Sequence, residues 1–330
     1  MKITSYLEEI KANNLFKTIV DRFIRDYAKE DGFKYLALRK KGNKFFIELS
    51  YNHKMNQKKV HEIIKYIDTN LNSALSVTTL KYFAIQSSRK KRINKHKKKL
   101  KVKTKLSDVD FSFFHGKKIS GNSIRRPEHN ETPGTIGGII ELENHKGLYL
   151  MSNYHVIMRD SGKLDSSVFN DDGIAIGKLF WGKFDDKFDI ALAKITTSKP
   201  PKRGVHDFKF GKLTPPSYSK INLTSFSAGG SDTGEIYSIN SIVKIGANVF
   251  KNQILFKKSR LEPGDSGTLI VSGNKKVRDV VGLFIGGENV SSDNSIKIAN
   301  NLFNLFSNTV EEFKDHKDRI MPKIKFKTFY

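Results

Sequence analysis

The sequence predicts a mainly β fold over residues 109–330, preceded by a small α+β domain over residues 1–87. In the longer, C-terminal part, many short apolar runs alternate with glycine-rich turns, which is typical of paired antiparallel β-barrels. In the first 87 residues, helical and strand periodicities succeed one another. A lysine-rich stretch, residues 88–108, separates the two parts and is predicted to be a linker.

The N-terminal part shows five periodic segments. Apolar residues within 5–29 recur at helical spacing, and residues 57–71 repeat that pattern. Residues 33–38, 45–51 and 76–85 have the composition of strands. The order helix, strand, strand, helix, strand predicts a small α+β module. Because this region holds no catalytic signature, we expect it to have an accessory or regulatory role and to bind a regulatory protein.

The chain is strongly basic, with 59 Lys and Arg against 34 Asp and Glu, a formal charge of +25. The segment Arg89–Lys105 alone holds 11 basic residues and no acidic one. Like charges repel one another, so one interpretation of this segment is a solvated linker. The alternative is salt-sensitive binding of nucleic-acid phosphates. No aromatic residues interleave with these charges, so base stacking is not supported.

Several features limit the classes of function. The chain has no cysteine, which excludes disulfides and thiolate metal sites and fits a reducing compartment. No motif predicts a cofactor or a metal. The first residues lack the apolar stretch of a signal peptide, and no run approaches the roughly 18 apolar residues of a membrane span. We therefore expect a cytoplasmic protein with no membrane partner, no cofactor and no metal.

Residues 262–268, Glu-Pro-Gly-Asp-Ser-Gly-Thr, form a candidate nucleophile turn ahead of an apolar run. Ser266 lies between an acidic residue and a glycine on a tight Pro-Gly turn. Gly264 and Gly267 leave room for backbone N–H groups to approach a reacting carbonyl. The N–H groups of Gly264 and Ser266 are the candidate oxyanion hole. The same tetrapeptide is also an ordinary turn sequence, so other residues must decide its role.

A base and a carboxylate occur upstream in the chain. His155 follows the apolar run 148–151, and Asp189 begins another apolar run. A serine hydroxyl needs a neutral imidazole to take its proton, and that imidazole needs a buried carboxylate to orient it. Asp185 and Asp186 compete with Asp189, but the apolar run after Asp189 favours a buried strand position. Taken alone, a histidine at a strand end is more often structural.

The three motifs together resemble those of the trypsin/chymotrypsin-like serine peptidases, in particular the cysteine-free bacterial intracellular type. The matched motifs are Ser-Asn-x-His-Val, Asp-Ile-Ala-Leu and Gly-Asp-Ser-Gly, within residues 109–312. The resemblance implies a trypsin-like double β-barrel. It also implies a serine endopeptidase acting on peptides or proteins, with His155 as base, Asp189 as its orienting carboxylate and Ser266 as nucleophile. The helical spacing of apolar residues within 300–313 predicts a closing C-terminal helix there.

The resemblance also implies substrate-binding residues. Arg260, six residues before the serine, matches a position that often lies at the floor of the family's specificity pocket. Aimed into that pocket, it would favour acidic side chains. Gly286 and Gly287 match the strand edge on which the family's substrates pair.

One departure from the family pattern concerns activation. The sequence Ile136-Gly137-Gly138-Ile139 is similar to the activation site of secreted members, yet it begins only 19 residues before His155. We therefore expect no activating cleavage there, and we expect Asp265 to have an internal partner.

Two function classes follow from the sequence. The first is a serine endopeptidase restrained by its N-terminal domain or by a partner; some related bacterial proteases act in stress or phage defence. The alternative is a nucleic-acid-binding protein that uses residues 89–105 and carries a catalytically degenerate protease-like scaffold.

Overall fold

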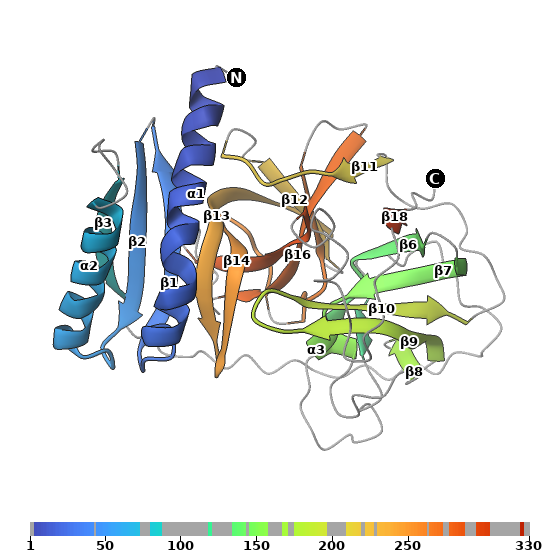
Figure 1. Ribbon diagram of the computed structural model, residues 1–330. Coiled ribbons are helices and arrows are strands. Elements are labelled where there is room, and N and C mark those ends of the chain that lie inside the picture. The colour runs from blue at the N-terminus through green and yellow to red at the C-terminus, as the bar shows by residue number, and fades with distance from the viewer. Residues whose placement is uncertain are drawn as a thin grey trace. The chain divides into compact units, whose positions relative to one another are not determined.

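The computed structural model places most of the predicted elements in two compact units (Figure 1). The first unit is Met1–Lys101 with Tyr237–Leu255, and the second is Val102–Ile236 with Phe256–Tyr330. The structure describes residues 3–42, 44–72, 80–87, 118–120, 134–142, 145–157, 167–170, 175–196, 209–218, 222–227, 230–262, 264–272, 277–287, 295–303 and 324–326.

The N-terminal elements of the first unit follow the predicted order. They are α1 (Ile3–Asp26), β1 (Phe33–Lys41), β2 (Lys44–Asn52), α2 (Gln57–Asn72) and β3 (Leu80–Ser87). Strand β2 pairs antiparallel with β1 and parallel with β3. Leu7 and Ile10 at the start of α1 are exposed, but most of the apolar residues that predicted these elements are buried, among them Phe16, Ile19, Phe23, Leu36, Leu38, Ile47, Leu49 and Ile63.

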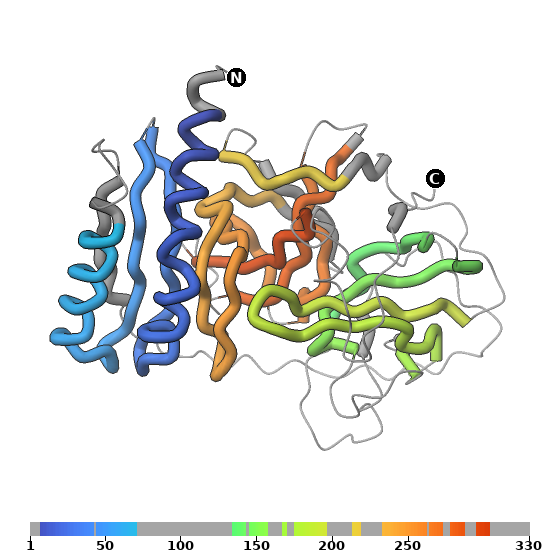
Figure 2. Tube along the Cα trace, viewed as in Figure 1, coloured from blue at the N-terminus to red at the C-terminus, as the bar shows by residue number. Residues whose placement is uncertain are grey.

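The first unit also contains a hairpin from much later in the chain. Strands β13 (Gly230–Ile245) and β14 (Asn248–Lys257) contribute their residues Tyr237–Leu255 to it. Strand β13 lies beside β1 (Figure 2) and pairs with it antiparallel. Tyr35 is opposite Val243, and Leu38 is opposite Asn240. The predicted domain end at residue 87 and the linker over 88–108 lie at and beyond the limit of the described residues. The basic segment Arg89–Lys105, with its predicted nucleic-acid partner, also lies outside them.

A buried polar cluster joins β1 and β2 to β13. The Glu48 carboxylate accepts hydrogen bonds from Tyr35 and Tyr237, each at 2.7 Å, and forms an ion pair with Arg39 at 2.5 Å. Arg39 also donates to the hydroxyl of Tyr237. Burial, followed by the Glu48 charge, raises the pKa of Tyr35. Burial and the hydrogen bond to Glu48 raise the pKa of Tyr237.

The second unit holds two sheets. In the first sheet the pairings are antiparallel, and the order is β18 (Ile324–Phe326), β6 (Gly138–Leu142), β7 (His145–Ser152), β10 (Asp189–Ile195), β9 (Ala175–Phe184), β8 (Ser167–Asn170), β4 (Lys118–Ser120) and β5 (Gly134–Thr135).

The second sheet of this unit carries the serine turn. Its strands follow the order β12 (Asn222–Ser227), β15 (Leu269–Ser272), β16 (Val277–Gly287) and β17 (Lys297–Asn301). Strand β11 (Lys209–Leu213) pairs parallel with β16, and the start of β13 pairs with β12. Both sheets contribute to one core cluster, which includes Tyr149, Trp181, Leu192, Leu269, Val271 and Leu283.

These sheets confirm the prediction of a mainly β, antiparallel fold for this region. Closure of these sheets into two barrels stays a prediction. No helix in the described part of the chain is long and apolar enough to cross a membrane.

The helix predicted over residues 300–313 is wrong at its start. Asn300 and Asn301 are the last residues of β17, opposite Leu283 and Gly282 of β16. Leu302 and Phe303, which follow directly, are helical, so the prediction fails at residues 300 and 301, where pairing with β16 extends the strand. Residues 304–313 lie outside the described residues.

Candidate active site

His155 lies in the short helix α3 (Tyr154–Ile157), directly after β7. Asn153 starts this turn, because its backbone carbonyl accepts the N–H groups of Val156 and Ile157 at 3.3 and 3.2 Å. Val156 and Ile157 are buried and hold the turn in place, whereas the His155 side chain is 37% exposed. The sequence pattern thus anchors the backbone here and leaves the imidazole accessible.

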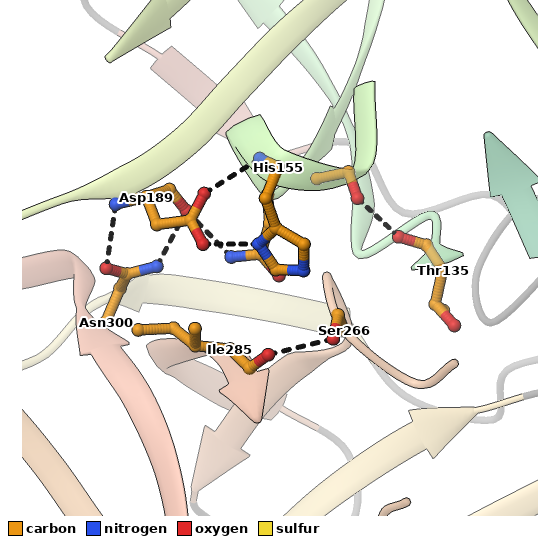
Figure 3. A network of polar contacts seen from close by, with 8 residues as sticks. Thr135, His155, Asp189, Ser266, Ile285 and Asn300 are labelled. Atoms are coloured by element: carbon orange, nitrogen blue, oxygen red, sulfur yellow. Dashed lines mark hydrogen bonds and ion pairs between the residues drawn. The ribbon is translucent and has the colours of Figure 1, made fainter. Parts of the chain in front are cut away.

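The Asp189 carboxylate makes two contacts with His155. Its Oδ1 accepts the His155 backbone N–H at 3.0 Å, and its Oδ2 lies 2.5 Å from the His155 Nδ1 (Figure 3). An ionised carboxylate can only accept, so Nδ1 carries the proton and Nε2 is left to act as a base. Asp189 is the first residue of β10 and its side chain is 1% exposed, which confirms the predicted strand start and burial.

The competing aspartates have different surroundings. The Asp185 Oδ1 accepts the backbone N–H groups of Lys187 and Phe188, both at 2.8 Å. This is the turn that reverses β9 into β10, so Asp185 has a local structural role. Asp186 is exposed. Burial, and then the Asp189 charge, raises the pKa of the Tyr154 phenol, which precedes the histidine.

Two asparagines hold the main chain of Asp189. The Asn300 side chain donates to the Asp189 carbonyl at 2.8 Å and accepts the Asp189 N–H at 3.1 Å. The Asn153 side chain donates to the same carbonyl at 2.7 Å. Sequence reasoning missed both residues. Asn153 could have been found, because it precedes the histidine within its motif, but no local pattern marks Asn300.

The serine turn packs against the end of β7, three residues before the histidine. Gly267 has a φ of +98°, and a Cβ there would lie 2.2 Å from both the Ser152 Oγ and the Thr135 carbonyl oxygen. The Ser266 carbonyl accepts the Thr135 N–H at 2.7 Å. The Ser152 hydroxyl in turn donates to the Thr135 carbonyl at 2.7 Å. These contacts bring the serine turn to the strand that leads into His155.

The Ser266 hydroxyl donates to the Ile285 carbonyl at 2.8 Å and is half-buried (Figure 3). Among the described residues, no hydrogen bond joins Ser266 to His155. A single hydroxyl proton can be donated to only one acceptor at a time. In this arrangement the Ser266 proton is therefore donated to β16 of the second sheet and not to His155.

Two backbone N–H groups of the serine turn are hydrogen-bonded to carbonyls of the protein. The N–H groups of Asp265 and Gly267 donate to Glu262 at 3.0 Å and to Phe284 at 2.8 Å. The Asp265 carboxylate accepts the Glu262 N–H at 3.0 Å, which confirms the expected internal partner. The oxyanion hole formed by the N–H groups of Gly264 and Ser266 stays a prediction.

Of the predicted substrate residues, one precedes the serine turn in the chain and two follow it. Gly286 and Gly287 end β16, and their pairing partners are Ile298 and Lys297 of β17. On the other side of β16, the register with β15 ends at Leu283. Arg260 is exposed, and its role in specificity stays a prediction.

The described ranges contain no candidate metal site. No group of three or more histidine, aspartate or glutamate side chains could hold a metal ion there. Residues Ile136–Ile139, which are similar to an activation site, are buried, and Gly137 donates its N–H to the Met151 carbonyl at 2.9 Å.

Comparison with known proteins identifies no family. No family model and no curated protein matches the chain. Among solved structures, Thermobifida fusca Protease A has a TM-score of 0.45 and 14% identity, covering 64% of this chain and 100% of that one. Nocardiopsis protease has a TM-score of 0.46 and 14% identity, and the match covers 59% of this chain and 95% of that one. Cellulomonas bogoriensis chymotrypsin has a TM-score of 0.44 and 16% identity, and the match covers 59% of this chain and 94% of that one.

These neighbours are bacterial serine proteases, but their low identities and TM-scores say nothing about activity. The case for function rests on the geometry of the site.

Proposed function

We propose that the protein is a serine endopeptidase of the cytoplasm with a Ser266, His155 and Asp189 triad. The observation that carries the proposal is the double contact between the buried Asp189 carboxylate and His155. This contact orients the imidazole and leaves its Nε2 available, which is the arrangement that activates a serine hydroxyl. The serine turn packs against the same strand end, which supports Ser266 as the third member.

The proposed reaction begins when Ser266 rotates about its Cα–Cβ bond and leaves the Ile285 carbonyl. Its hydroxyl gives its proton to His155 Nε2 while Oγ attacks the peptide carbonyl. The resulting oxyanion accepts hydrogen bonds from the N–H groups of Gly264 and Ser266. The intermediate collapses to an acyl-serine, and His155 returns the proton to the leaving amine. Water, deprotonated by His155, then hydrolyses the ester and restores Ser266.

The proposed substrate is an extended peptide. On the side facing away from β17, the register of β16 with β15 ends at Leu283, so Ile285 to Gly287 offer backbone groups to a further strand. Arg260 would favour acidic side chains beside the scissile bond. Restraint of the site is assigned to residues 1–87 or to a regulatory protein bound there.

A fluorophosphonate probe tests the proposal without knowledge of the substrate. The full-length protein is expected to form a covalent adduct at Ser266, located by mass spectrometry of its peptides. Ser266→Ala and His155→Ala are expected to abolish labelling, because the first removes the nucleophile and the second its base.

Ser227→Ala, which changes a serine outside the proposed triad, is the matched control and should label like the wild type. Labelling that persists in Ser266→Ala, or its absence from the folded wild type under all conditions tested, would contradict the proposed nucleophile.

A further inference from the structure

We propose that Asn300 is a positioning residue, which sets the orientation of the Asp189 carboxylate, and through it His155, from a strand of the other sheet. This inference rests on the proposed function. Asn300 belongs to β17 in the second sheet of the unit, whereas Asp189 begins β10 in the first. The residues are 111 positions apart in the chain.

The Asn300 amide makes a two-point contact with one residue. Its Oδ1 accepts the Asp189 N–H at 3.1 Å and its Nδ2 donates to the Asp189 carbonyl at 2.8 Å (Figure 3). A side-chain amide is planar and carries a donor and an acceptor, so both hydrogen bonds fix the peptide groups on either side of the Asp189 Cα. The direction of the Asp189 Cβ is then fixed as well.

The contacts with His155 restrict the side-chain torsions of Asp189. With Cβ fixed, only the two side-chain torsions place the carboxylate, and its contacts with the His155 N–H and Nδ1 hold both oxygens. The path from Asn300 through Asp189 to His155 therefore contains hydrogen bonds at every step. Asn300 itself is fully buried, which strengthens these bonds and keeps water from replacing them.

Asn153 cannot replace this contact. It donates to the Asp189 carbonyl but makes no contact with the Asp189 N–H among the described residues. It also lies in the turn that carries His155, so it moves with the histidine. Among the side chains in the described ranges, Asn300 is the one that joins Asp189 to the sheet that bears Ser266, and this is why its loss should misplace the imidazole relative to the serine.

Two substitutions at Asn300, each compared with the same change at a buried neighbour, distinguish a positioning role from the general effect of changing a buried residue. Asn300→Asp keeps the shape and the acceptor but places an oxygen against the Asp189 carbonyl. Asn300→Ser is the milder change and serves if the first variant does not fold. The matched controls are Asn301→Asp and Asn301→Ser, because Asn301 is the next residue of β17, is also buried and points to the opposite face.

The first measurement is fluorophosphonate labelling of the full-length variants, with the saturating rate separated from probe affinity. Both Asn300 variants are expected to lower the saturating rate, by about 100-fold for Asn300→Asp, with affinity nearly unchanged, as expected for a small misplacement of catalytic groups. The Asn301 variants should lose less than about 3-fold, after correction for the folded fraction.

The second measurement is the NMR resonance of the His155 Nδ1 proton in the folded protein, which reports its hydrogen bond to Asp189 without any reaction. It should shift or broaden in the Asn300 variants and stay in place in the Asn301 variants. A folded Asn300→Ser protein with an unchanged resonance and rate would overturn the proposal. A wild type that never labels, but whose resonance responds to Asn300, would refute the peptidase function and leave the positioning role supported.

Discussion

At the scale of single residues, the serine turn depends on Gly267. Its φ of +98° lies in the region that favours glycine, and an added Cβ would meet the Thr135 carbonyl and the Ser152 hydroxyl at 2.2 Å. Both neighbours are buried, and one of them is backbone. The turn has no room to shift without moving the strand that leads to His155.

We expect Gly267→Ala to destabilise the protein by about 2–4 kcal/mol, because it adds backbone strain to an overpacked contact. It should also abolish fluorophosphonate labelling of the folded fraction. Urea unfolding followed by circular dichroism measures the first effect. An unchanged unfolding midpoint would show that the turn can relax.

Gly286→Ala, in contrast to Gly267→Ala, is expected to leave stability nearly unchanged. A Cβ at Gly286 would meet nothing within 4 Å, so stability should change by less than about 0.5 kcal/mol. Because this edge is proposed to pair with the substrate, the KM for a cleaved peptide should rise severalfold. Peptide kinetics beside a thermal melt test this, and a lower melting temperature with an unchanged KM would argue against the substrate edge.

Local patterns explain which site residues could be predicted. His155, Asp189 and Ser266 each sit in a short motif beside an apolar run, and the burial of Asp189 follows from the residues after it. Asn300 has no such signal, since its partner is 111 positions away and its own surroundings looked helical. The hydrogen bond from Ser266 to Ile285 likewise depends on how two segments of a sheet meet.

At the scale of elements, the Glu48 cluster is the main polar connection between β1, β2 and β13. Three side chains converge on one buried carboxylate, from residues up to 189 positions apart. The pairing of β1 with β13 is therefore fixed by specific hydrogen bonds as well as by backbone pairing.

We expect Glu48→Ala to lower the free energy of unfolding by about 3–5 kcal/mol, because it leaves Arg39 and two tyrosine hydroxyls without their acceptor. Glu62→Ala is the control, since Glu62 forms an exposed ion pair with Lys59 at 3.1 Å and should change nothing measurable. Equal effects of both variants in urea unfolding would contradict the importance of the cluster.

Periodicity predicted the elements themselves well, but not their partners. The order of the five N-terminal elements followed from apolar spacing in the helices and from composition in the strands. The pairing of β1 with β13 did not, because any exposed strand edge presents the same backbone groups and the partner lies far along the chain.

At the scale of the whole molecule, the buried tyrosines predict an alkaline limit to stability. Burial raises the pKa of Tyr35 above its ordinary value of 10.0, and burial and hydrogen bonding do the same for Tyr237. Above pH 10 the unfolded chain loses these protons while the folded protein keeps them. The unfolded state then binds fewer protons, so stability falls as pH rises.

We expect the free energy of unfolding to fall between pH 10 and 11, and Tyr35→Phe to reduce that slope by about 1 kcal/mol per pH unit. Urea titrations at a series of pH values, wild type beside variant, measure both slopes, and lysines contribute equally to each. Parallel slopes would mean that the Tyr35 proton is not retained in the folded state.

The pairing of β1 with β13 can form only late in the synthesis of the chain. Tyr35 leaves the ribosome about 200 residues before its partner Val243, which at about 5–20 residues per second is a wait of roughly 10–40 s. During that interval the free edge of β1 can pair with another strand, including that of a neighbouring nascent chain. Synthesis on crowded polysomes, or a stall before residue 237, would therefore favour aggregation, and binding of a chaperone to the exposed edge would protect the N-terminal elements until the hairpin arrives.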